Sequence, residues 1–96
     1  MALTGVFVTF THAAAGASVY GAAAASETVA SGTSTTNTSQ HPNDIVRITA
    51  DDAGAYYVAI AASPNPNTSP RWYVRAGETI DVMVGAPNLK VGVVSV

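Results

Sequence analysis

The sequence predicts a single all-β domain, a small antiparallel β-sandwich or barrel of jelly-roll-like form with six to eight strands. Its 96 residues fit one domain. Short runs of alternating apolar and polar residues recur along the chain, as strands with one buried face require. Turn residues separate these runs at short intervals, which is typical of sandwiches and barrels rather than of strand-helix-strand units.

The clearest strands lie within residues 44–62. Val46 and Ile48 alternate with Arg47 and Thr49, and residues 56–61 repeat this period of two. The residues between the two runs, ADDAG at 50–54, supply the Asp and Gly chemistry of a tight turn. This stretch therefore predicts two strands joined by a short hairpin loop.

The N-terminal residues 1–10 predict a further strand, because Val6, Val8 and Phe10 alternate with Phe7 and Thr9. They do not have the pattern of a signal peptide, since the first basic residue is Arg47 and threonines interrupt the apolar run. No window reaches the ~20 apolar residues of a membrane-spanning helix. We therefore expect a chain that is made in the cytoplasm, is not secreted and does not bind membranes.

Residues 13–40 form an Ala/Ser/Thr-rich segment that we interpret as an arm or a long loop. Alanine favours helix, but each glycine in it costs about 1 kcal/mol in a helix interior, and Val19, Tyr20 and Val29 build no helical stripe. A strand-like conformation is therefore expected for residues 12–30, and a loop or exposed arm for 31–40. Because ordering costs about 1–2 kcal/mol per residue, we expect a neighbouring chain to order this segment, with Val19 and Tyr20 as interface anchors.

The C-terminal part alternates turns and strands. Residues 63–70 (SPNPNTSP) predict a stiff surface loop, and residues 71–75, 79–84 and 89–96 predict strands. Trp72 is expected in the core, although Arg71, Trp72 and Arg75 could instead form a stacking surface for a sugar or a base. The predicted core is Val6, Val8, Val46, Ile48, Tyr56, Val58, Ile60, Trp72, Val74, Ile80, Val82, Val91 and Val93.

Composition argues against several functions. Four Lys and Arg stand against six Asp and Glu, so the net charge is −2 and no basic stripe for nucleic acid is expected. The chain has no Cys, and His12 and His41 lack companions at metal-ligand spacing. The adjacent Asp51 and Asp52 suit a turn better than a cation site. We expect no enzyme activity, no catalytic residue, no metal and no cofactor.

The order of features from residue 45 to 96 resembles a type of small virion protein of tailed phages. The resemblance rests on the strand at 46–48, the strand AYYVAI at 55–60, a Pro-containing loop, an aromatic strand leading into AGE at 76–78, and the terminal KVGVV at 90–94. It implies a compact β-sandwich or barrel that decorates or cements a capsid, commonly as a trimer. The chain departs from that type in the segment 13–40.

Two function classes follow as expectations. The first is a structural virion protein, located on the capsid surface, whose partners are itself, as a homotrimer, and a major capsid protein. Interface residues are then expected at Val19, Tyr20, Arg71, Tyr73 and Arg75. The alternative is a glycan-binding or receptor-binding β module of a phage fibre or surface protein, which a concave aromatic cluster would distinguish.

Overall fold

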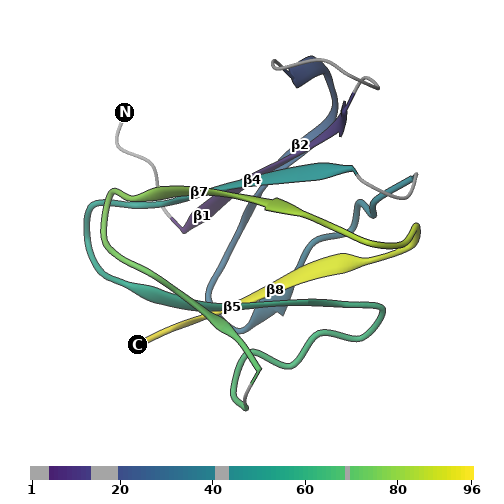
Figure 1. Cartoon of the computed structure of the whole chain (residues 1–96). Helices are drawn as coiled ribbons and strands as arrows, with labels where there is room; N and C mark the ends of the chain where they lie inside the picture. The colour runs from purple at the N-terminus through teal and green to yellow at the C-terminus, as the bar shows by residue number, and fades with distance from the viewer. Residues whose placement is uncertain (1–4, 14–19, 41–43, 69) are drawn as a thin grey trace.

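The chain folds into two antiparallel four-stranded β-sheets packed face to face (Figure 1). The structure is a computed structural model, and it describes residues 5–13, 20–40, 44–68 and 70–96. One sheet has the strand order β2-β1-β4-β7 and the other β3-β8-β5-β6. The predicted all-β sandwich is therefore confirmed. The strands are β1 (Val6–Ala13), β2 (Tyr20–Val29), β3 (Thr33–Ser34), β4 (Ile45–Ala50), β5 (Tyr56–Ala61), β6 (Trp72–Val74), β7 (Thr79–Met83) and β8 (Lys90–Ser95).

Three of the strand pairs are nested around the loop that follows β5. The pair β5–β6 lies closest to this loop, β4–β7 comes next and β3–β8 lies outermost. Each pairing is symmetric about nearly the same point, near Pro64. Residues 33–93 therefore form one long antiparallel ribbon that is rolled into both sheets, which is the jelly-roll-like arrangement that the sequence predicted. The pairings β1–β4 and β5–β8 join the turns of the roll.

The predicted hairpin between the strands at 45–50 and 56–61 is wrong. Strand β4 pairs with β1 and β7, whereas β5 pairs with β8 and β6 in the opposite sheet. The residues between them carry the chain from one sheet to the other. Asp and Gly residues favour a turn, but they do not decide whether the next strand joins the same sheet or the opposite one. The ADDAG sequence is therefore compatible with a hairpin and with a crossing between sheets.

Asp51 fastens this crossing between the sheets. Its carboxylate accepts hydrogen bonds from the Gly5 amide at 2.8 Å, the Tyr56 hydroxyl at 2.9 Å and the Ala53 amide at 3.0 Å. The bonds from Gly5 and Tyr56 hold the pKa of the Asp51 carboxyl below its usual value. Burial, together with the bond to Asp51, raises the pKa of the Tyr56 hydroxyl. One carboxylate thus ties the start of β1, the crossing and the start of β5 together.

The core lies between the sheets and consists mainly of valines. Buried apolar side chains come from both sheets, and the predicted core positions on β1, β4, β6 and β8 are confirmed except for Trp72. On β5 and β7, Tyr56 and Val58 are buried, whereas Ile60, Ile80 and Val82 are only partly buried. Trp72 is a correction, since 52% of its side chain is exposed. It lies on the short edge strand β6, where the sheet does not extend far enough to cover an indole ring. The buried apolar residues are Val6, Val8, Phe10, Val29, Val46, Ile48, Ala50, Tyr56, Val58, Ala59, Val74, Val84, Val91 and Val93.

The described part of segment 13–40 is held within the chain itself. The strand-like interpretation is confirmed for Tyr20–Val29, which is strand β2 and pairs with β1. Strand β1 supplies its hydrogen-bonding partner within the chain; the expected contact of this segment with a neighbouring chain stays a prediction. Glu27 of β2 then accepts bonds from the backbone amides of Thr36 and Asn37, both at 2.9 Å. Burial opposes ionisation of Glu27, but these bonds outweigh it and lower the pKa of its carboxyl.

The loop that follows β3 also contributes buried polar residues, which the sequence did not predict. Thr35 and Ser39 are buried, and their hydroxyls accept bonds from the amides of Val91 and Leu89, each at 3.0 Å. These bonds extend the antiparallel pairing of β3 with β8 into the loop that follows β3. The predicted turn at 41–43 lies outside the described residues.

Candidate functional site

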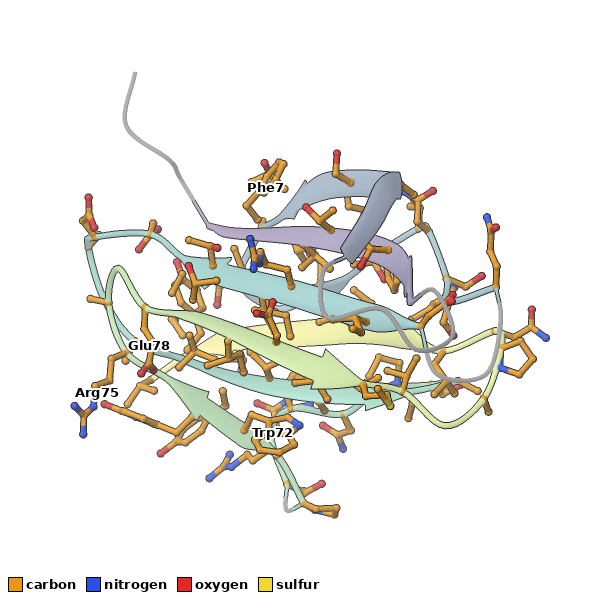
Figure 2. All side chains as sticks on the ribbon, turned by 45° about the horizontal axis from the view of Figure 1, so that its top comes forward. Phe7, Trp72, Arg75 and Glu78 are labelled. Atoms are coloured by element: carbon orange, nitrogen blue, oxygen red, sulfur yellow. The ribbon has the colours of Figure 1, made fainter. Side chains whose placement is uncertain are left out.

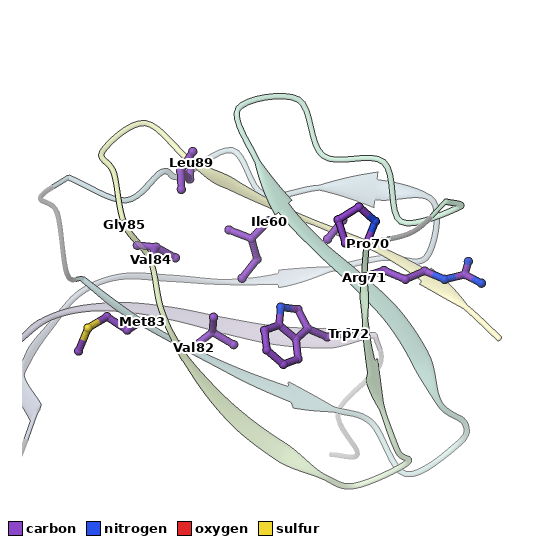
Figure 3. A pocket seen from close by; sticks show the side chains of 10 residues that line it. Ile60, Pro70, Arg71, Trp72, Val82, Met83, Val84, Gly85 and Leu89 are labelled. Atoms are coloured by element: carbon purple, nitrogen blue, oxygen red, sulfur yellow. The ribbon is translucent and has the colours of Figure 1, made fainter.

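A groove with a volume of about 470 Å³ opens between the edges of the two sheets. Strand β6 ends one sheet, β7 ends the other, and side chains from both strands line the groove. Figure 3 shows the indole of Trp72 facing Val82 and Ile60 across this space. The lining residues are Ala59, Ile60, Pro70, Arg71, Trp72, Val82, Met83, Val84, Gly85 and Leu89.

The groove exists because the strands on this side are too short to close the sandwich. Trp72 pairs with Val58, whose side chain is fully buried, so both side chains point toward the space between the sheets. Val58 lies on a central strand and is covered, whereas β6 has no strand beyond it in the sheet. The Trp72 side chain therefore forms one wall of the groove and remains half exposed.

Most of the side chains that line the groove are apolar. Arg71 is the one charged residue among those that line it, and its guanidinium points away from the space in Figure 3. Trp72 is 52% exposed in the groove, and Met83, whose side chain points away from the space in Figure 3, is 61% exposed beside it. An exposed apolar patch of this kind on a small domain is typical of a surface that binds another protein.

A second cluster lies on the outer face of the sheet that contains β6. The guanidinium of Arg71 stacks 3.6 Å from the centre of the Tyr57 ring and donates a 3.1 Å hydrogen bond to the carbonyl of Pro66. The Tyr57 and Tyr73 rings meet edge to face, with centres 5.8 Å apart. Stacking on an aromatic face and bonding to a carbonyl fix Arg71 in one orientation.

The structure brings together three of the five residues predicted as interface residues. Arg71, Tyr73 and Arg75 lie on β6 or directly beside it, and Tyr73 is 53% exposed. Figure 2 shows Arg75 extending outward next to Glu78. Tyr20 is the first residue of β2, which forms one edge of the sheet whose opposite edge is β7. Val19 lies outside the described residues.

Sequence reasoning missed the residues that make this side of the molecule concave. Val82 and Ile60 were predicted in the core but lie partly exposed along the groove, and Met83 and Leu89 were not singled out. Alternation places Val82 and Ile60 on inward faces correctly. It gives no signal that the strands carrying them lie at an open side of the sandwich.

No group of three or more His, Cys, Asp or Glu side chains that could hold a metal ion is found among the described residues. Among them there is also no helix that is both long and apolar enough to cross a membrane.

Comparisons with protein-family models, with curated proteins and with solved structures found no match to this chain.

Proposed function

We propose that the chain is a non-enzymatic structural protein of a tailed-phage virion, which binds the capsid surface as a decoration or cement subunit. The observation that carries this proposal is the groove between the edges of β6 and β7, which is lined mostly by apolar side chains and in which Trp72 is half exposed. A capsid protein would cover this surface, and the chain would associate with itself as a trimer. The resemblance of residues 45–96 to small virion proteins supports the same class.

Energetics support a protein partner. Burying a large apolar side chain completely contributes about 1.5–3 kcal/mol, and aromatic anchors seated in a partner's surface often dominate binding energy. Trp72 is half exposed in the groove, and Met83 is exposed beside it on the outer face of β7. Covering both would therefore supply a substantial part of the energy of attachment.

A glycan-binding module is the second candidate, because a half-exposed indole lines a concave surface. A sugar site also needs convergent polar groups to bond the hydroxyls. Arg71 alone among the lining residues carries a charged group, and its guanidinium points away from the groove in Figure 3. The composition of the groove therefore favours a protein partner over a glycan.

The test uses phage particles purified from the biological source of the sequence. Mass spectrometry should find the chain in these particles, and antibody labelling in electron micrographs should mark their heads. Recombinant protein should also sediment with particles from which the native subunit has been stripped. Sedimentation velocity of the free protein should show a trimer. Absence of the chain from the particles, or failure of the recombinant protein to bind them, would refute the proposal.

A pair of variants connects attachment to the groove. Trp72→Ser removes the indole at the groove, whereas Phe7→Ser removes an exposed ring on the other sheet, where Phe7 is 39% exposed. Circular dichroism should show both variants folded. We expect Trp72→Ser to reduce sedimentation with particles at least tenfold and Phe7→Ser to leave it unchanged. Equal binding by both would show that the groove does not hold the capsid.

A further inference from the structure

Strand β6 is the edge of its sheet on the side of the groove. Among the described residues its one strand partner is β5, through the pairs Tyr56–Val74, Tyr57–Tyr73 and Val58–Trp72. An edge strand presents backbone amides and carbonyls that have no partner strand on the outer side. An extended segment of another chain can therefore pair with it and continue the sheet.

The side chains of β6 define two different faces for such an added strand. Trp72 points into the apolar groove, and Tyr73 points to the outer face of the sheet, where its ring meets Tyr57. Successive residues of an added strand would likewise point to opposite faces. Every second residue would thus lie over the groove, which favours an apolar side chain there.

Two arginines and one glutamate lie around β6 on the outer side of its sheet. Arg71 and Arg75 flank the strand, one on each side. The ion pair that the structure shows among its described residues joins Arg47 to Asp81 on the other sheet, and neither Arg71 nor Arg75 has a carboxylate within ion-pair distance there. The Glu78 carboxylate, which lies close to Arg75, accepts the backbone amide of Arg75 at 3.0 Å.

We propose that β6 binds an acidic, extended segment of the partner protein by strand addition. Alternate residues of that segment are apolar and fill the groove, and carboxylates on its other face pair with Arg71 and Arg75. The two arginines are four positions apart, so the carboxylates lie about 13 Å apart at ~3.3 Å per residue. The segment then has the pattern acidic, apolar, any, apolar, acidic. This rests on the proposed function and names the chemistry of the surface that the subunit recognises.

The experiment uses Trp72 as its reporter, because it is the one tryptophan of the chain and lines the groove. The full chain is titrated to millimolar concentration with the capped peptide Glu-Val-Thr-Val-Glu. The control peptides are Lys-Val-Thr-Val-Lys and an acidic peptide whose central amide is N-methylated to block strand pairing. We expect a blue shift of the indole emission and at least tenfold tighter binding of the unmodified acidic peptide than of either control.

Charge-reversed protein tests the two arginines directly. In the double variant Arg71→Glu and Arg75→Glu the preference should reverse, so that the Lys peptide binds more tightly than the Glu peptide. Raising the salt concentration should weaken binding of the acidic peptide to the original protein. An absent shift, equal binding of acidic and basic peptides, or equal binding of the N-methylated peptide would overturn strand addition by an acidic segment.

The outcomes separate this inference from the proposed function. If Trp72→Ser abolishes attachment to particles while the peptides show no charge preference, the subunit binds its capsid through the groove without an acidic strand. If the protein alone is a dimer whose β6 amides are already protected from hydrogen exchange, a second copy occupies the edge and the proposal is wrong.

Discussion

Replacing Phe10 by alanine tests the assignment of the core most directly. Phe10 lies on β1 between the sheets with 1% of its side chain exposed, and it pairs with Val46. A buried Phe→Ala change costs about 3–5 kcal/mol, because the transfer energy is lost and a cavity remains. A domain of this size has a total stability of about 5–14 kcal/mol. The Phe10→Ala variant should therefore lose a large share of its free energy of unfolding.

Two other aromatic positions provide matched comparisons. Phe7 lies on the same strand but is 39% exposed, and Trp72 is 52% exposed at the groove. Water already reaches both positions, so truncation leaves no closed cavity. The cost of Trp72→Ala should then be about half that of a buried ring, roughly 1.5–2.5 kcal/mol, with a similar value for Phe7→Ala.

Urea unfolding followed by far-UV circular dichroism measures all three variants, since this signal does not depend on the tryptophan. The expected order of destabilisation places Phe10→Ala well above the other two. A loss for Trp72→Ala as large as that for Phe10→Ala would show that the indole is buried in solution. The groove would then be closed, and the reasoning about its partner would be refuted.

Two further predictions concern glycine conformation and the dependence of stability on pH. Gly5 and Gly32 both have positive φ, at 92° and 83°, so alanine at either position should cost about 1–2 kcal/mol of stability. Thermal unfolding should show a clearly larger loss for Gly5→Ala than for Gly32→Ala. The added Cβ would lie 2.6 Å from the Val29 carbonyl oxygen at Gly5, whereas at Gly32 it would meet open space. Folding lowers the pKa of the Asp51 and Glu27 carboxyls, so both carboxylates stabilise the fold at pH values above their usual pKa values of 3.8 and 4.5, and this contribution is lost as the pH falls through the folded-state pKa. The melting temperature should therefore decrease below about pH 4, and it should decrease less steeply in an Asp51→Asn variant. An unchanged slope in that variant would contradict the prediction.

The strands could be predicted from the sequence, but their pairing could not. Alternation of Val46 with Arg47, and of Tyr56 with Tyr57, reports which side chains are buried and hence where strands run. It contains no information on which strand lies alongside. Asp51 illustrates this limit, because an aspartate suits a hairpin turn and a crossing between sheets equally well. Only a contact between residues distant in sequence, here the hydrogen bond from the Gly5 amide to Asp51, distinguishes the two.

The candidate site was predicted only in part for a similar reason. Arg71 and Tyr73 are among the interface residues expected from the sequence, and both lie on or beside β6, at the edge of the groove. Trp72 was placed in the core because a large ring usually contributes to it. Its exposure depends on a strand of three residues at the end of a sheet, which is a property of the whole arrangement.

The nested ribbon has a consequence for the order of folding events. Strands β3 and β8 are far apart in sequence, and closing such a loop directly costs entropy that slows folding. Once β5 and β6 have paired, however, β4 and β7 begin close together, and their pairing in turn brings β3 and β8 together. Folding should thus proceed outward from the loop near Pro64, with β1 added late. Mutations at Tyr57 should slow folding, whereas mutations at Val6 should mainly accelerate unfolding, and stopped-flow measurements of both variants would show whether this order is correct.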